Sequence, residues 1–113
     1  MLPAFVLVHS PSVGPSTWTP VADRLSARGY PTRVPTLTSV ATGTPPFWPH
    51  VVDAVLASLT DLPADQPVVL VAHSNAGLFV PVIRKALHHP VLACVFVDAS
   101  LPARTGETPM PGR

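Results

Sequence analysis

Three short apolar runs without polar alternation constrain the fold of this 113-residue chain more than any other feature. They span residues 4–9, 67–72 and 91–97, and each has the length of one β-strand. Runs of this kind are typical of strands that are buried on both faces, as in a parallel sheet. A weaker fourth strand is predicted at 32–35, where Pro35 cuts the run short.

Stretches with helical patterns separate these runs. The first spans 19–29 and ends at Gly29, a typical stop residue, and the second spans 50–59 with its apolar residues on one face. A third helix is expected over 75–89, in which Pro81 should either kink the helix or start a second segment. The alternation of strands and helices predicts an α/β fold with a parallel sheet and helices on its faces.

Composition and charge narrow the class of protein. The length allows one domain at most. Hydrophobic residues make up 47% and charged residues only 12%, with a mean hydropathy of +0.38, which argues against disorder. The net charge of +1, with the signs scattered, excludes the electrostatic pattern of a protein that binds nucleic acid or an anionic membrane surface.

The lengths of the apolar runs and the number of cysteines narrow the class of protein further. No apolar run approaches the ~18 residues of a transmembrane helix. The single cysteine, Cys94, allows neither an intrachain disulfide nor a cysteine-based metal site. A cytoplasmic location is therefore the default expectation.

The strongest chemical signal is the string Val71-Ala-His-Ser-Asn-Ala-Gly77. It places Ser74 just after a buried strand and at the start of a helix, between the small residues Ala72 and Ala76. A nucleophile elbow requires this arrangement, because its sharp turn packs the flanking residues closely. The N–H of Asn75 could then help to bind an oxyanion. The usual pattern has glycines where this chain has alanines, and a serine that caps a helix is the alternative.

A second string, residues 5–18, follows the first strand and contains His-Ser and a later Trp. Together with the elbow it resembles the α/β-hydrolase superfamily, and most closely the small bacterial and plant branch that includes hydroxynitrile lyases and methyl esterases. The segment 96–102 is also similar to the one after that family's next strand. The resemblance covers about residues 4–102 and implies that Ser74 is the nucleophile and that the Asn75 N–H is one oxyanion donor.

The turn after the first strand departs from the family pattern. The superfamily commonly takes its second oxyanion donor from a backbone N–H at the position that matches Pro11, and proline has none. The hydroxyl or N–H of Ser10 is the favoured substitute, and the N–H of Ser12 is another. His9 is expected to brace the turn rather than to take part in the reaction.

A larger departure concerns the general base that a serine nucleophile requires. The superfamily places its histidine after the last strand, but only His88 and His89 follow Ser74. They are expected at the far end of the third helix, as partners of the helix dipole or as surface residues. His50 is a weak candidate for the base. Asp98, at the end of the fourth strand, is a weak candidate for the triad acid, and an Asx turn or an N-cap at the strand exit is the preferred alternative.

The resemblance implies a partial α/β-hydrolase fold: a four-stranded parallel sheet in the order second–first–third–fourth strand, with helices on both faces in three layers. Residues 1–102 would be the amino-terminal half of the domain, and 103–113 a proline-rich tail that is loop or disordered. The implied function is a serine hydrolase, an esterase or acyl hydrolase on a small molecule that needs no metal or organic cofactor. This chain alone is expected to be inactive or feeble. The alternative is a non-catalytic remnant, a binding or assembly module that needs a partner chain.

Two expectations concern the fourth strand, 91–97. It lacks the neighbours that it would have in the family, so its free edge predicts self-association. Cys94 within it is expected to be buried and slow to react. The candidate apolar walls of a substrate pocket are aromatic: Trp18, Phe47, Trp48 and Phe79.

Overall fold

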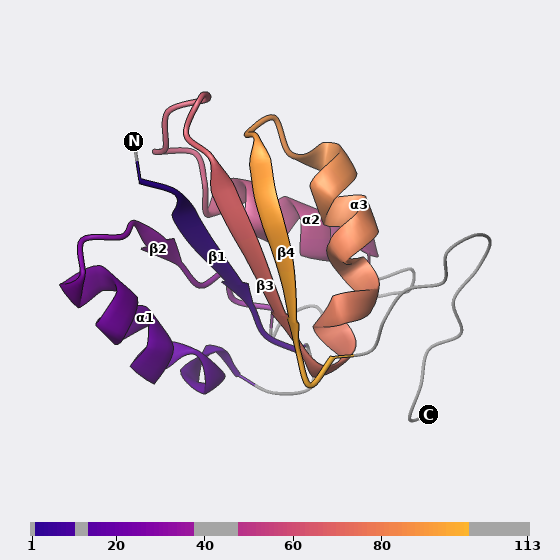
Figure 1. Cartoon of the computed structure of the whole chain (residues 1–113). Coiled ribbons are helices and arrows are strands. Elements are labelled where there is room, and N and C mark those ends of the chain that lie inside the picture. Colours follow the sequence, from indigo (N-terminus) through magenta and orange to yellow (C-terminus); the bar gives the residue numbers. More distant parts are fainter. Residues whose placement is uncertain (1, 11–13, 38–47, 100–113) are drawn as a thin grey trace.

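A parallel sheet forms the centre of the molecule in the computed structural model, which describes residues 2–10, 14–37 and 48–99 (Figure 1). Its four strands are all parallel and follow the order β2-β1-β3-β4. They are β1 (Ala4–Val8), β2 (Thr32–Arg33), β3 (Val68–His73) and β4 (Val91–Val97). The predicted α/β class, strand directions and strand order are confirmed.

Helical segments connect the strands. They are η1 (Pro15–Thr17), α1 (Thr19–Ala27), α2 (Trp48–Ala57), η3 (Ser74–Phe79) and α3 (Val80–Ala86). The chain leaves α1 through Gly29, whose φ of +89° favours glycine, as the sequence predicted. No helix in the described ranges is both long enough and apolar enough to cross a membrane. The proline-rich tail predicted at 103–113 lies outside the described residues.

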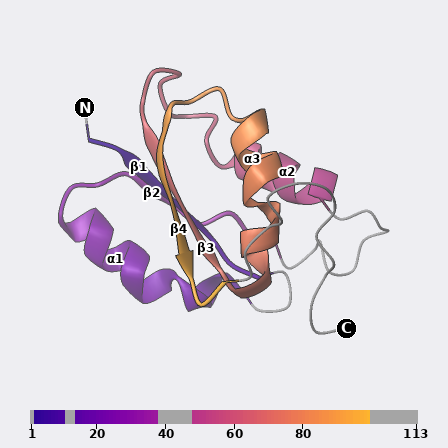
Figure 2. The same ribbon diagram turned by 45° about the vertical axis from the view of Figure 1, so that its right-hand side comes forward.

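The helices form two layers around the sheet. In Figures 1 and 2, α1 lies on one face, and α2 and α3 lie on the other. Leu7 and Val71 point toward α1, whereas Val6 and Leu70 belong to the larger core under α2 and α3. The central strands β1 and β3 are thus buried on both faces, which explains why their sequences show no polar alternation.

The strand β4 is more exposed than the sequence suggested. Among the described residues its only neighbour in the sheet is β3, and Leu92, Val95 and Val97 have exposed fractions of 61%, 42% and 40%. The expectation of a strand buried on both faces is wrong for β4, because the core that contains α1 covers β1, β3 and the segment after β2 and includes no residue of β4. Cys94 is accordingly half-buried and not buried as predicted.

The third predicted helix divides into two. The 3-10 segment η3 is followed by α3, and Pro81 lies in the first turn of α3, so the proline starts a second segment. The helix α3 ends at Ala86. His88 and His89 therefore lie in the loop before β4, and the prediction that they end a helix is wrong.

Candidate active site

Ser74 occupies the turn between the central strand β3 and the segment η3. Its φ of +57° lies in the left-handed region, which costs a residue with a side chain about 1–2 kcal/mol relative to the right-handed region. Ala72 before it and Ala76 after it are both fully buried, so larger side chains have no room at either position. A strained strand-to-helix turn between two small residues is the geometry that a nucleophile elbow requires.

The residue after the turn, Asn75, is half-buried and lies in the first turn of η3. Backbone N–H groups in the first turn of a helical segment have no partner within the segment. The N–H of Asn75 can therefore stabilise negative charge on an oxygen bound beside Ser74. Its role as an oxyanion donor remains a prediction.

Asp98 lies beside Ser74 at the carboxyl edge of the sheet. The register pairs His73 with Val97, so Ser74 and Asp98 are the residues that follow two paired positions on neighbouring strands. Asp98 is exposed and has a φ of +47°. Ser74 and Asp98 are the only non-glycine residues with positive φ in the described part of the chain. Strained backbone of this kind clusters at functional sites.

His9 braces the turn after β1, as the sequence predicted. The side chain is fully buried, and its Nε2 accepts a hydrogen bond of 2.9 Å from the N–H of Leu37. Because Nε2 accepts, the ring proton resides on Nδ1, which donates to the carbonyl oxygen of Ser10 at 2.7 Å. Both ring nitrogens are thus occupied, and His9 is not available as a base for Ser74.

Ser10, the candidate second oxyanion donor, is buried with an exposed fraction of 1%. Its carbonyl orientation is fixed by the hydrogen bond from His9. The contribution of Ser10 to an oxyanion site stays a prediction. Pro11 and Ser12, which the sequence argument also used, lie outside the described residues.

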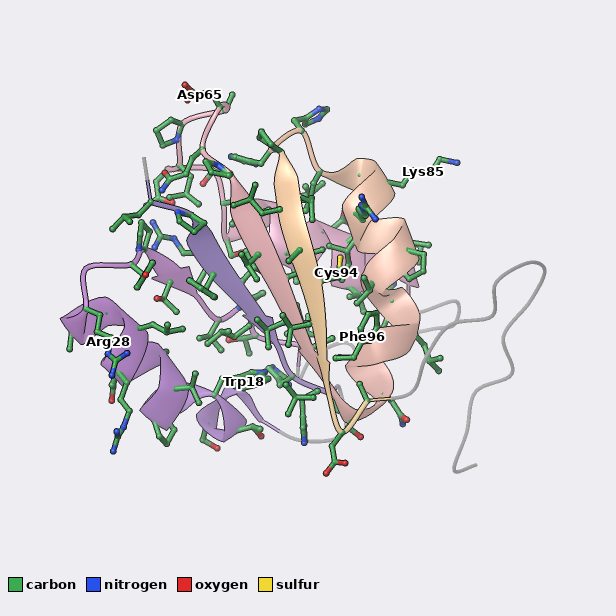
Figure 3. All side chains as sticks on the ribbon, in the orientation of Figure 1. Trp18, Arg28, Asp65, Lys85, Cys94 and Phe96 are labelled. Carbon is green, nitrogen blue, oxygen red and sulfur yellow. The ribbon has the colours of Figure 1, made fainter. Side chains whose placement is uncertain are left out.

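His73, the residue before the nucleophile, points toward α1. Its ring packs edge-on against Trp18, with ring centroids 6.1 Å apart and an interplanar angle of 81°. Trp18 belongs to the smaller core beneath α1 (Figure 3). His73 is therefore held on the α1 side of the sheet by packing.

The other histidines belong to other parts of the molecule, and no hydrogen bond joins an imidazole of the described residues to Ser74. His50 is exposed on α2. His88 and His89 precede β4, at the amino edge of the sheet, whereas Ser74 is at the carboxyl edge. The seven residues of β4 separate these two edges by about 20 Å, at ~3.3 Å per residue.

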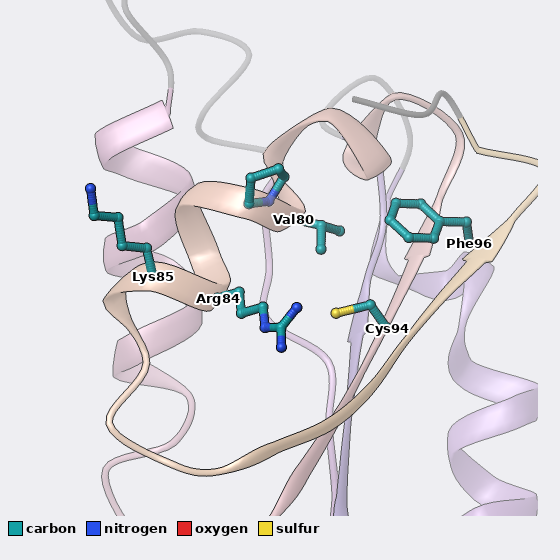
Figure 4. Close-up of a pocket in the computed structure, with 6 residues that line it drawn as sticks. Val80, Arg84, Lys85, Cys94 and Phe96 are labelled. Carbon is teal, nitrogen blue, oxygen red and sulfur yellow. The ribbon is translucent and has the colours of Figure 1, made fainter. Parts of the chain in front are cut away.

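Only two of the four expected aromatic pocket walls have side chains within the described part of the structure. Trp18 and Phe79 are core residues with exposed fractions of 6% and 8%, and Phe47 and the Trp48 side chain lie outside what the structure describes. A hollow of about 570 Å³ lies instead between α3 and β4 (Figure 4). The sequence argument missed it, although the alternation of Cys94 and Phe96 along β4 could have indicated that both face α3. The lining residues are Val80, Pro81, Arg84, Lys85, Cys94 and Phe96.

Within the described ranges, no group of three or more His, Cys, Asp or Glu side chains lies close enough together to hold a metal ion. A scan against protein-family models finds no match to this chain, and a search of curated proteins finds no related sequence. A functional argument therefore depends on the geometry at the carboxyl edge of the sheet.

Proposed function

We propose that this chain carries the nucleophile of an α/β-hydrolase-type serine hydrolase, with Ser74 acting on an ester or related acyl group of a small molecule. The observation that supports this most directly is the left-handed φ of Ser74, in a turn flanked by two fully buried alanines. A serine that only capped a helix would use the extended conformation that cap residues normally adopt, without strain.

The chemistry follows from the position of the hydroxyl group. Ser74 Oγ attacks the acyl carbon while a base takes its proton, and the N–H of Asn75 stabilises the oxyanion that forms. The bond to the alcohol then breaks, and the base returns the proton to the departing oxygen. Water hydrolyses the acyl-serine by the same route and releases the acid.

No imidazole among the described residues is hydrogen-bonded to Ser74, so the base that this reaction requires is not in place there. General-base assistance contributes about 10²- to 10⁴-fold to such reactions. A lone copy should consequently hydrolyse esters only feebly. Asp98, on the neighbouring strand end, is well placed to orient an imidazole brought to Ser74 from elsewhere.

Labelling with a fluorophosphonate, followed by peptide mass spectrometry, tests this proposal. We expect slow labelling of the dilute chain that is confined to Ser74 and is lost in Ser74→Ala. Ser58→Ala is the matched control, because Ser58 donates its hydroxyl to the Val55 carbonyl oxygen on α2, away from the site. Labelling that is absent under saturating reagent, or that persists in Ser74→Ala, would contradict the proposal.

The second candidate is a binding or assembly module without chemistry. The exposed apolar side chains of β4 favour it, because they are suited to contact with another chain. This candidate predicts no reaction at Ser74 under any conditions, so the labelling experiment separates the two.

A further inference from the structure

The hollow between α3 and β4 has the size and the lining of a small-molecule site. Its volume of about 570 Å³ lies within the range of ~300–1,000 Å³ that is usual for ligand pockets. Both elements contribute walls: Val80 and Pro81 from the start of α3, and Cys94 and Phe96 from β4 (Figure 4). These four side chains are apolar, so the hollow is suited to a hydrocarbon or aromatic group.

The packing of the neighbouring elements explains why this space is open. The helix α3 packs against α2, and β4 is the last strand of the sheet in the described part of the chain. Val80 and Ile83 of α3 are buried, whereas Cys94 and Phe96 are only half-buried although they contact the same core. Apolar surface of β4 therefore remains in contact with water, and a ligand that covers it gains free energy from its burial.

One charged group extends into the hollow. In Figure 4 the guanidinium of Arg84 extends from α3 toward Cys94, whereas the ammonium group of Lys85 points away from the hollow. Arg84 is exposed and has no ion-pair partner in the part of the chain that the structure describes. None of the six described residues that line the hollow is acidic. The hollow therefore combines apolar walls with one unpaired cation, which an anionic group of a ligand would complement.

We propose that this hollow binds a small amphipathic carboxylate, with the carboxylate group on Arg84 and the hydrocarbon chain against Val80 and Phe96. A planar guanidinium matches the two oxygens of a carboxylate. The single cation also balances the charge of a carboxylate better than that of a phosphate monoester, which is about −1.5 to −2 at pH 7. Binding here involves no chemistry at Ser74, so the inference goes beyond the proposed function.

A titration with octanoate, followed by amide NMR spectra, tests the site. We expect saturable shifts of the Arg84, Cys94 and Phe96 signals and none along α1. Octanamide has the same chain without the charge and should bind about three- to fivefold more weakly, because an exposed ion pair makes a modest contribution. Added salt should weaken the binding of octanoate only. Shifts that do not saturate, or equal affinities for the two compounds, would overturn the proposal.

Substitution of the cation tests its role separately. Arg84→Gln should bind octanoate about three- to fivefold more weakly than the wild type and should bind octanamide unchanged. Arg28→Gln is the matched control, because Arg28 is equally an exposed arginine but lies at the end of α1, away from Cys94 (Figure 3). An equal loss of octanoate affinity in Arg28→Gln would show that only the net charge matters, and this would overturn the assignment to Arg84.

Substitution of a wall tests where the hydrocarbon chain lies. Phe96→Ala should weaken the binding of octanoate and octanamide by the same factor, because it removes apolar contact and leaves Arg84 in place. Val95→Ala is the control on the same strand, since Val95 is exposed and does not line the hollow. Unchanged affinities in a folded Phe96→Ala chain would place the ligand elsewhere and overturn the proposal. Ser74→Ala should bind octanoate as the wild type does, so this inference and the proposed function fail separately.

Discussion

Ser74, the proposed nucleophile, has a backbone conformation that is costly for a residue with a side chain. Its side chain sits on a backbone that glycine would adopt more easily, since φ is +57°. The nucleophile role proposed for the hydroxyl would account for a serine at this position in place of glycine.

The strain at Ser74 predicts an unusual order of stabilities. The free energy of unfolding of Ser74→Gly should be about 1 kcal/mol higher than that of Ser74→Ala, because alanine retains the Cβ that the left-handed region disfavours. The same pair of substitutions at Ser26, which is exposed on α1, should give the opposite order, since glycine is the poorer helix residue. Urea denaturation of the four variants measures both differences. An equal stability of the two Ser74 variants would show that the turn is not strained.

His9 and His73, each of which has a buried ring nitrogen, should respond differently to loss of their polar atoms. His9→Phe leaves the N–H of Leu37 without its acceptor, which should lower the free energy of unfolding by about 1–3 kcal/mol. His73→Phe removes a buried Nδ1 that has no hydrogen-bond partner, and keeps the edge-on contact with Trp18. It should therefore leave stability unchanged or raise it. Thermal unfolding of both variants checks the contrast, and equal losses would contradict it.

At the scale of elements, the sequence predicted what local chemistry determines. The apolar runs located the strands, Gly29 ended α1, and Pro81 started a second helical segment. The burial of β4 could not be predicted, because an apolar strand has the same sequence whether or not another element covers it. The end of α3 could have been predicted more closely, since Pro90 disfavours helical backbone at the residue before it.

The candidate site was predictable in part for the same reason. The turn at Ser74 follows from small neighbours and a preceding buried strand, all within residues 68–76. The adjacency of Ser74 and Asp98 depends on the register of β3 against β4, which involves residues far apart in the sequence. The hollow between α3 and β4 depends on the packing of two elements, and no short motif encodes it.

An ion pair links β2 to the segment after α2 and should make stability depend on pH. Arg33 donates to Asp61 at 2.7 Å, and this hydrogen bond lowers the pKa of the Asp61 carboxyl below its usual value. A carboxyl whose pKa is lower in the folded state stabilises the fold above its unfolded-state pKa. That contribution is lost as the pH falls through the folded-state pKa.

The wild-type chain should consequently be slightly more stable than Asp61→Asn at neutral pH, and the difference should vanish in strong acid. Urea denaturation at both pH values measures it, and added salt at neutral pH should shrink the difference because the pair is at the surface. Asp65→Asn controls for the change in net charge. A difference between wild type and Asp61→Asn that is the same at both pH values would be inconsistent with the pair.

Cys94 offers a probe of the hollow between α3 and β4. Its sulfur points into the hollow, toward Arg84 (Figure 4), so thiol reagents should reach it without denaturant. Each reagent's rate with Cys94 is divided by its rate with a small free thiol. This ratio should be higher for an anionic disulfide reagent than for neutral iodoacetamide, because Arg84 attracts the anion, and Arg84→Gln should reduce the difference. The mass of the modified chain, followed over time, measures the rates of both reactions. Labelling that requires denaturant would show that the hollow is closed in solution.

At the scale of the whole molecule, the most extensive pairing of β1 is with β3, a strand that is distant from it in the sequence. β1 pairs with β3 along its whole length, from Ala4 with Val68 to Val8 with Ala72. Its pairing with β2 involves only two positions. The Gln66 side chain also donates a hydrogen bond to the carbonyl oxygen of Leu2. The segments that precede β1 and β3 are therefore joined as well as the strands themselves.

This strand order has a consequence for synthesis of the protein. β1 leaves the ribosome well before β3, because the whole segment between Val8 and Val68 is synthesised before the strand that holds β1 in place. Until Val68 and the residues after it emerge, the apolar β1 has nothing to pair with except the short β2. The nascent chain therefore exposes the apolar β1 while the residues between it and β3 are being made, and the centre of the sheet can form only after β3 has emerged.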